Sequence, residues 1–116
     1  KLPVSAPFHC ELMNKATEIM KKELEKVDFK KSNNTLISNV TADEILDIKD
    51  LKNLLISQIE KRVRWRESIV NMVNYGVSQF IEIGPGKVLS GLIKRINKDV
   101  KITSINNQSD IESLKI

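Results

Sequence analysis

The sequence contains one cysteine, one histidine and few aromatic residues, and each scarcity excludes a class of protein. A single cysteine rules out an internal disulfide and suits a reducing compartment, so we expect a cytoplasmic protein. His9 and Cys10 are adjacent, with no further cysteine or histidine, so we expect no metal site. Because aromatic residues make up only 4% of the chain, aliphatic residues must fill the interior.

Long hydrophobic stretches are also missing. No apolar run reaches the length of about 18 residues that a transmembrane helix needs. The first ten residues hold two prolines and a histidine where a signal peptide would have its apolar region. We therefore expect no membrane partner. The sequence opens on Lys1 rather than on methionine, which we interpret as a segment of a longer polypeptide.

The formal net charge is +4, but the basic residues form no stripe. Lysines are scattered among acidic residues, as in the segment 21–31, and the chain has no stripe of basic residues interleaved with aromatic residues, which a binder of single-stranded nucleic acid requires. We expect no nucleic-acid partner. A mildly basic surface suits phosphate-bearing cofactors and an acidic carrier protein equally well, and an ordinary solvated surface also explains it.

Hydrophobic periodicity predicts alternating helices and strands. Apolar residues three and four apart predict helices over residues 10–26, 48–59, 63–75 and 88–96, with a last helical turn over 110–114. Short apolar runs predict strands over 35–40, 79–83 and 100–105. Asp43 or Asp47 would cap the second helix, Gly76 would end the third, and Pro85 would occupy the first position of the fourth.

This order predicts an α/β fold with a mostly parallel sheet flanked by helices. No internal repeat, low-complexity tract or flexible linker interrupts the chain. We therefore expect residues 1–116 to form a single structural unit.

His9 is the first candidate for chemistry, because histidine is the side chain that most readily exchanges protons near neutral pH. It lies in the segment 5–10, which we expect to follow a further strand and to precede the first helix, and ligand sites gather at the carboxyl ends of strands. A packed or surface histidine is the alternative. Cys10 is a candidate nucleophile, but neighbours in sequence need not meet side chain to side chain, and a buried cysteine is commonly inert.

Two other patterns have structural explanations. The segment 84–87 (GPGK) lies at an expected strand-to-helix turn, where backbone N–H groups can meet an anion. It lacks the spacing of a nucleotide-binding loop, and glycines that relax a tight turn explain it equally well. No GxSxG elbow occurs, so the chain has no recognisable serine nucleophile.

Three segments together resemble malonyl-CoA:acyl-carrier-protein transacylases. Residues 3–13 (PVSAPFHCELM) are similar to the histidine motif of that family, and Gln58, Trp65, Ser68 and Ile69 are similar to its Gln…W…SV block. Residues 80–92 (FIEIGPGKVLSGL) match its E-x-GPGKVL-x-GL segment almost letter for letter. The order and spacing agree across nearly the whole chain.

The resemblance implies a two-step acyl transfer in fatty-acid biosynthesis. A serine takes the malonyl group from coenzyme A and passes it to the phosphopantetheine thiol of acyl carrier protein, with His9 as general base and then acid. The backbone carbonyl of Gln58 would orient His9. Malonyl-CoA is the substrate, acyl carrier protein is the partner, and no separate cofactor is implied.

The resemblance also implies what this chain does not contain. In the family, the serine elbow, the arginine that pairs with the malonyl carboxylate, and a ferredoxin-like subdomain all precede the histidine motif. We therefore expect the chain to be the C-terminal segment of an acyltransferase domain with an α/β-hydrolase-like core. It would need the N-terminal remainder of the same enzyme, and the 116 residues alone should be inactive.

Phe8 is the candidate for substrate selectivity. In related polyketide synthase acyltransferases, phenylalanine directly before the histidine accompanies malonyl and serine accompanies methylmalonyl, because a bulky ring crowds an α-methyl branch. Packing of Phe8 beneath the following helix is the alternative.

Two readings of the whole chain stay open beside this one. The chain could be an acyltransferase segment of a polyketide or fatty-acid synthase. It could also be a non-catalytic binding module that uses its basic face.

Overall fold

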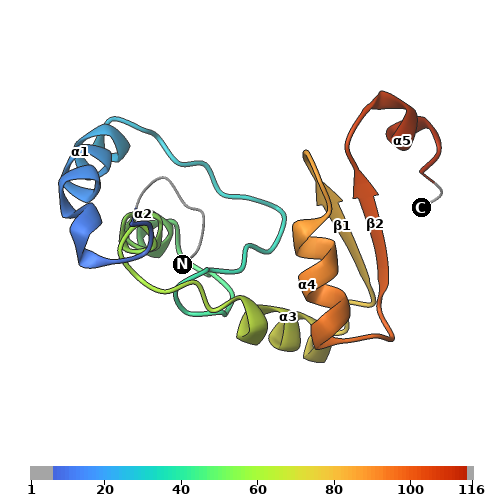
Figure 1. Ribbon diagram of the computed structural model, residues 1–116. Coiled ribbons are helices and arrows are strands. Elements are labelled where there is room, and N and C mark those ends of the chain that lie inside the picture. The colour runs from blue at the N-terminus through green and yellow to red at the C-terminus, as the bar shows by residue number, and fades with distance from the viewer. Residues whose placement is uncertain (1–6, 115–116) are drawn as a thin grey trace. The chain divides into compact units, whose positions relative to one another are not determined.

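The computed structural model describes residues 7–114, so residues 3–6 at the start of the histidine motif lie outside the described residues. Its contacts group the chain into two compact units, Lys1–Ser68 and Ile69–Ile116, and each is described by itself (Figure 1). The expectation that the whole chain forms part of one acyltransferase domain stays a prediction.

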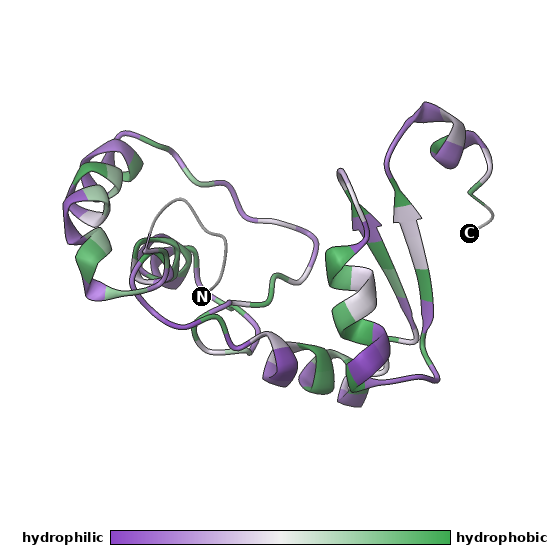
Figure 2. Cartoon of the chain, viewed as in Figure 1, coloured by the Kyte–Doolittle hydropathy of each residue, from purple (hydrophilic) through white to green (hydrophobic). Residues whose placement is uncertain are grey.

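The first unit begins with a short 3₁₀ helix, η1 (Glu11–Met13), that continues into α1 (Asn14–Glu25). This agrees with the helix expected over residues 10–26. Hydrophobic and hydrophilic residues alternate around α1, as Figure 2 shows, yet none of its residues is buried. Within α1, Ile19 is 58% exposed and Met20 is 43% exposed, although α1 contacts α2.

The strand predicted over residues 35–40 is wrong, because only Ile37 forms a β-bridge, to Glu44. The reason is a turn that begins at Ser38, here called the Ser38 turn (residues 38–42). Its hydroxyl accepts hydrogen bonds from the backbone N–H groups of Val40 at 3.1 Å and Thr41 at 3.3 Å. Such local bonds compete with a strand ladder. The chain then passes through Ala42, which is fully buried and has a φ of 63°.

Helix α2 (Ile48–Ser57) begins at Asp47, whose side chain accepts from the backbone N–H of Lys49 at 2.8 Å. Asp47 rather than Asp43 is therefore the cap. Helix α3 (Trp65–Asn74) ends as predicted at Gly76, which has a φ of 97°. Two hydrogen bonds, from Gly76 N–H to Val73 and from Val77 N–H to Met72, close this helix end in a Schellman motif.

The second unit contains a parallel two-stranded sheet. Strands β1 (Gln79–Ile83) and β2 (Lys101–Ile105) pair in register from Gln79 opposite Lys101 to Ile83 opposite Ile105. Helix α4 (Val88–Ile96) connects them and packs against both strands, and α5 (Gln108–Glu112) follows β2 (Figure 1). The predicted α/β class with parallel strands is confirmed. Ile93 of α4 and Ile105 of β2 are buried.

Helix α4 begins later than the sequence predicts. Its N-cap is Lys87 and its first residue is Val88, so Pro85 does not occupy the first helical position. Gly84 and Gly86 have φ values of 140° and 95°, which place the turn in conformations that a proline-initiated helix does not use. The loop therefore reverses direction before the helix starts. Within residues 7–114 no helix is long and apolar enough to cross a membrane.

Candidate functional site

The carboxyl end of α2 presents backbone carbonyl groups that the helix itself does not use. Gln58 is the C-cap, and the N–H groups of the last turn donate to Leu54, Ile56 and Ser57. The carbonyl oxygens of Gln58 and Ile59 lie beyond this ladder, where a helix carries partial negative charge. Both oxygens accept hydrogen bonds from His9.

His9 is held at two points. Its ring Nδ1 lies 2.8 Å from the backbone oxygen of Gln58, and its backbone N–H donates to the oxygen of Ile59 at 3.1 Å. The φ of His9 is 60°, in the left-handed region that few residues other than glycine adopt but in which histidine is enriched. The contact with Ile59 fixes the backbone in this conformation, so the ring is aimed at the end of α2.

This geometry determines which nitrogen can act as a base. A carbonyl oxygen only accepts hydrogen bonds, so Nδ1 carries the hydrogen and the neutral ring keeps its lone pair on Nε2. His9 is exposed on the described surface, so Nε2 is accessible. When Nε2 takes a proton, the ring keeps its bond to Gln58 and its charge lies at the negative end of a helix. The site therefore suits proton transfer through Nε2.

The two neighbours of His9 behave differently. The thiol of Cys10 donates to the backbone oxygen of Pro7 at 3.0 Å, so its proton is engaged with a carbonyl group rather than with the imidazole. This gives no support to Cys10 as a nucleophile. Phe8 is 56% exposed, so much of its side chain is open to the surroundings of this chain. The contact between His9 and Gln58 is a structural finding, whereas the roles of His9, Gln58 and Phe8 stay predictions.

The side chain of Gln58 makes a second connection. Its Oε1 accepts a hydrogen bond of 3.0 Å from Nδ2 of Asn39, and both residues are half-buried. Asn39 belongs to the Ser38 turn, inside the run that periodicity predicted to be a strand. Hydrophobic periodicity therefore does not identify Asn39 as a site residue. The signal that could have found it is the Ser-Asn pair itself, since both residues favour turns over strands.

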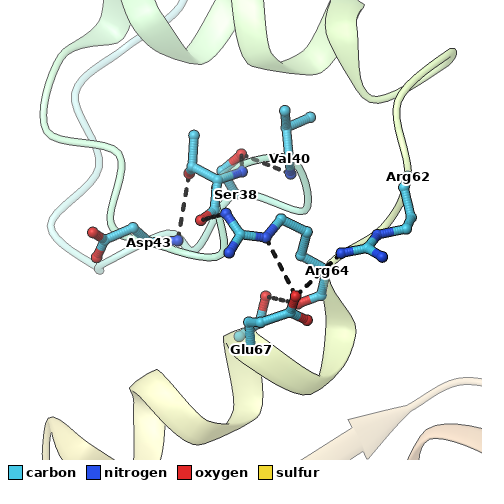
Figure 3. A network of polar contacts seen from close by, with 8 residues as sticks. Ser38, Val40, Asp43, Arg62, Arg64 and Glu67 are labelled. Carbon is cyan, nitrogen blue, oxygen red and sulfur yellow. Dashed lines mark hydrogen bonds and ion pairs between the residues drawn. The ribbon is translucent and has the colours of Figure 1, made fainter.

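Arg64 ties this turn to the start of α3 (Figure 3). Its backbone N–H donates to the oxygen of Asn39 at 2.9 Å, and its Nη1 donates to the oxygen of Thr41 at 3.0 Å. Glu67 lies 3.5 Å from Nε of Arg64 and 3.3 Å from Nη2 of Arg62. Hydrogen bonding of Glu67 to backbone N–H, and then the two arginines, lowers the pKa of its carboxyl group.

The strand-to-helix turn of the second unit does not offer a free anion site. The carboxylate of Glu82 accepts from the backbone N–H of Leu89 at 3.0 Å and of Ser90 at 2.8 Å. Hydrogen bonds from the hydroxyl and the N–H of Ser90, and then from Leu89, lower the pKa of Glu82. The N–H of Gly86 donates to Oδ1 of Asn106 at 2.6 Å. Side chains of this chain thus accept from the N–H groups of Gly86, Leu89 and Ser90, which favours the structural explanation of this motif.

The described residues contain no group of three or more histidine, cysteine, aspartate or glutamate residues that could hold a metal ion. A surface groove of about 460 Å³ lies between the 41–46 loop and α2, and His9 does not line it. A smaller hollow of about 110 Å³ is lined by both Asn39 and Gln58. Of the motif residues on α3, Ser68 is buried and its hydroxyl donates to the oxygen of Arg64 at 3.0 Å.

Comparison with known proteins gives one consistent result. No family model matches the chain. The malonyl CoA-acyl carrier protein transacylase of Bacillus subtilis (strain 168) is 46% identical over 111 residues, which is 96% of this chain and 35% of that protein. The transacylase of Staphylococcus aureus (strain COL) is 39% identical over 111 residues, covering 96% of this chain and 36% of that protein.

Solved structures agree. The malonyl CoA-acyl carrier protein transacylase from Clostridium perfringens superposes with a TM-score of 0.90 at 42% identity, over 97% of this chain and 36% of that one. A malonyl-transacylase in complex with its type II polyketide synthase acyl-carrier protein gives a TM-score of 0.89 at 32% identity, over 97% and 36%. The chain spans about a third of the length of the curated relatives it matches. The resemblance seen in the sequence is confirmed over almost the whole chain.

Proposed function

We propose, from the similarity of this chain to a third of malonyl CoA-acyl carrier protein transacylases, that it serves the same reaction. The protein that contains it would transfer a malonyl group from coenzyme A to the phosphopantetheine thiol of acyl carrier protein. The donor and the carrier protein are its substrates, and the cytoplasm is the compartment where we expect the reaction. No separate cofactor is proposed.

The observation that carries the proposal is the 2.8 Å hydrogen bond between His9 Nδ1 and the carbonyl of Gln58. A neutral acceptor fixes the tautomer without placing a second charge beside the ring. Nε2 is then available to take the proton of a serine hydroxyl. That serine would come from the part of the protein outside this chain, because the 116 residues contain no GxSxG elbow.

The malonyl group would be transferred in two steps, each with a proton transfer through Nε2 of His9. His9 Nε2 takes the hydroxyl proton as the serine oxygen attacks the malonyl thioester carbonyl. The C–S bond breaks, and the imidazolium returns the proton to the departing thiolate of coenzyme A. The thiol of the carrier protein then reacts with the malonyl-serine ester by the same route in reverse. Gln58 accepts from Nδ1–H throughout and steadies the positive ring.

Phe8 is proposed to line the acyl pocket. It directly precedes His9 and is 56% exposed, so its ring is free to face a substrate. An aromatic ring beside the thioester leaves little room for a branch on the α-carbon of the acyl group.

A second candidate concerns the carrier protein. One structural relative is a malonyl-transacylase bound to a type II polyketide synthase acyl-carrier protein. A carrier protein of polyketide synthesis is therefore an alternative acceptor for the same malonyl group. Comparing kcat/KM for the two classes of carrier protein distinguishes them.

The test uses the complete protein, radiolabelled malonyl-CoA and holo acyl carrier protein. We expect label on the carrier protein with the unmodified enzyme, and a rate at least about a hundredfold lower with His9→Ala, the contribution typical of a general base. The isolated 116 residues should form no malonylated band. An undiminished His9→Ala enzyme, or a labelled 116-residue chain, would contradict the proposal.

A further inference from the structure

Asn39 connects the Ser38 turn to the residue that holds His9. Its Nδ2 donates to Oε1 of Gln58 at 3.0 Å, while the backbone oxygen of Gln58 lies 2.8 Å from Nδ1 of His9. Gln58 thus has one hydrogen bond on its side chain and another on its carbonyl. A rotation of the Gln58 backbone would therefore alter the geometry of both hydrogen bonds.

A side-chain hydrogen bond at Gln58 can stabilise the position of its carbonyl group, because Gln58 lies at the end of α2. Gln58 is a C-cap with φ −64° and ψ −17°, and its carbonyl lies outside the helical ladder. Helix ends fray, and hydrogen bonds weaken steeply once their angle falls below about 120°. A rotation of the Gln58 peptide would therefore remove the acceptor from Nδ1–H while leaving the rest of α2 intact.

The backbone around Asn39 is fixed firmly enough to serve as an anchor. The hydroxyl of Ser38, which is only 4% exposed, bridges the N–H groups of Val40 and Thr41 at 3.1 and 3.3 Å. Arg64 donates to the oxygen of Asn39 at 2.9 Å and to that of Thr41 at 3.0 Å. Figure 3 shows the part of this network around Ser38, Val40, Arg64 and Glu67, in which the guanidinium of Arg64 lies between the turn and Glu67.

We propose that Asn39 is a positioning residue for His9, acting through the side chain of Gln58. The catalytic meaning of this inference rests on the proposed function, but its structural content does not. Asn39 touches neither substrate nor the ring. It restrains the Gln58 peptide, so the carbonyl stays in place and the neutral imidazole keeps its hydrogen on Nδ1. Without this restraint, part of the population carries the hydrogen on Nε2, where it blocks proton transfer from serine.

The kinetic test compares Asn39→Ala, Gln58→Met and the double variant in the complete protein. We expect each single variant to lower kcat/KM about twofold to tenfold, the range that one neutral hydrogen bond supports. The loss should lie in kcat, with the KM for malonyl-CoA nearly unchanged. The double variant should be no worse than the single variants, because they remove the same bond. Asn39→Asp retains an acceptor for the Gln58 amide and should lose less than Asn39→Ala.

Asn53→Ala is the matched control, because Asn53 is an exposed residue of α2, the helix that Gln58 caps. It should leave kcat/KM unchanged. Additive losses in the double variant would overturn the inference, as would an Asn39→Ala enzyme with full kcat.

A second readout does not depend on activity. Nitrogen-15 NMR of the complete protein, labelled at histidine and assigned with His9→Ala, reports the tautomer of His9 at a pH where the ring is neutral. In Asn39→Ala the two ring nitrogen resonances should move toward each other, and in Asn53→Ala they should not. Unchanged resonances in a folded Asn39→Ala protein overturn the inference. If circular dichroism shows that Asn39→Ala is unfolded, Gln58→Met provides the same comparison.

These readouts separate the two proposals. A complete protein that transfers no malonyl group but shows the tautomer shift refutes the proposed function and supports the role of Asn39. A complete protein that transfers malonyl but shows no shift of the His9 nitrogen resonances in Asn39→Ala supports the proposed function and refutes the role of Asn39.

Discussion

Replacing Gln58 by alanine tests whether its carbonyl or its side chain orients His9. The variant keeps the backbone oxygen that lies 2.8 Å from Nδ1 of His9. It removes only Oε1 of Gln58, which accepts a hydrogen bond from Asn39. One half-buried neutral hydrogen bond contributes about 0.5–1.5 kcal/mol net. At about 1.4 kcal/mol per factor of ten, Gln58→Ala should lower kcat/KM by roughly twofold to tenfold.

His9→Ala removes the base itself. General-base catalysis contributes about 10²–10⁴-fold, or roughly 2.7–5.4 kcal/mol, so this variant should lose at least ten times more activity than Gln58→Ala. The assay is the initial rate of malonyl transfer from malonyl-CoA to holo acyl carrier protein, measured at several donor concentrations. A Gln58→Ala enzyme as inactive as His9→Ala would refute the assignment of the orienting role to the carbonyl.

Three further predictions follow from particular residues. Gly76→Ala should lower the free energy of unfolding by about 1 kcal/mol because φ is 97° there, whereas Gly91→Ala in the interior of α4 should raise it by about 0.5–1 kcal/mol. Neither added Cβ meets an atom within 4 Å, so backbone conformation alone sets the sign. Urea unfolding that gave both changes the same sign would contradict this. The pKa of Glu82 is lowered from its ordinary value of 4.5, so its contribution to stability should be complete above that pH and disappear as the pH falls through the lowered pKa. The difference in unfolding free energy between the unmodified protein and Glu82→Gln should therefore shrink at acid pH. A constant difference would be evidence that the hydrogen bonds of Glu82 to the N–H groups of Leu89 and Ser90 do not stabilise the fold. Phe8→Ser should reduce the preference for malonyl-CoA over methylmalonyl-CoA by about tenfold in kcat/KM, and unchanged discrimination would rule out the steric role.

Hydrophobic periodicity predicts much of the fold, because the spacing of apolar residues in most segments matches the helix or strand that each segment forms. The apolar residues of β1, α4 and β2 recur at the spacing of the structures that they form. Gly76 ends α3 because the position requires a positive φ, which glycine adopts without steric strain. The segment 35–40 fails for an equally local reason. Its apolar composition indicates a strand, but the hydroxyl of Ser38 bonds the next backbone groups and turns the chain.

Residues of the candidate site can be predicted from the sequence only where they belong to a recognisable family motif. The resemblance selects His9 and Gln58, which are 49 positions apart, and the structure brings them into hydrogen-bonding contact. No pattern in the sequence links Asn39 to Gln58 or Glu82 to the N–H groups of α4, because these contacts depend on how turns present side chains in space. Periodicity reports burial and conformation, not hydrogen-bond partners.

The protonation of the His9 ring in the complete, unmodified protein tests the account most directly. Nitrogen-15 NMR at a pH where the ring is neutral should show the hydrogen on Nδ1, bonded to the carbonyl of Gln58, and a lone pair on Nε2. A spectrum with the hydrogen on Nε2 would contradict the account, because a ring in that form cannot accept a serine proton at its accessible nitrogen.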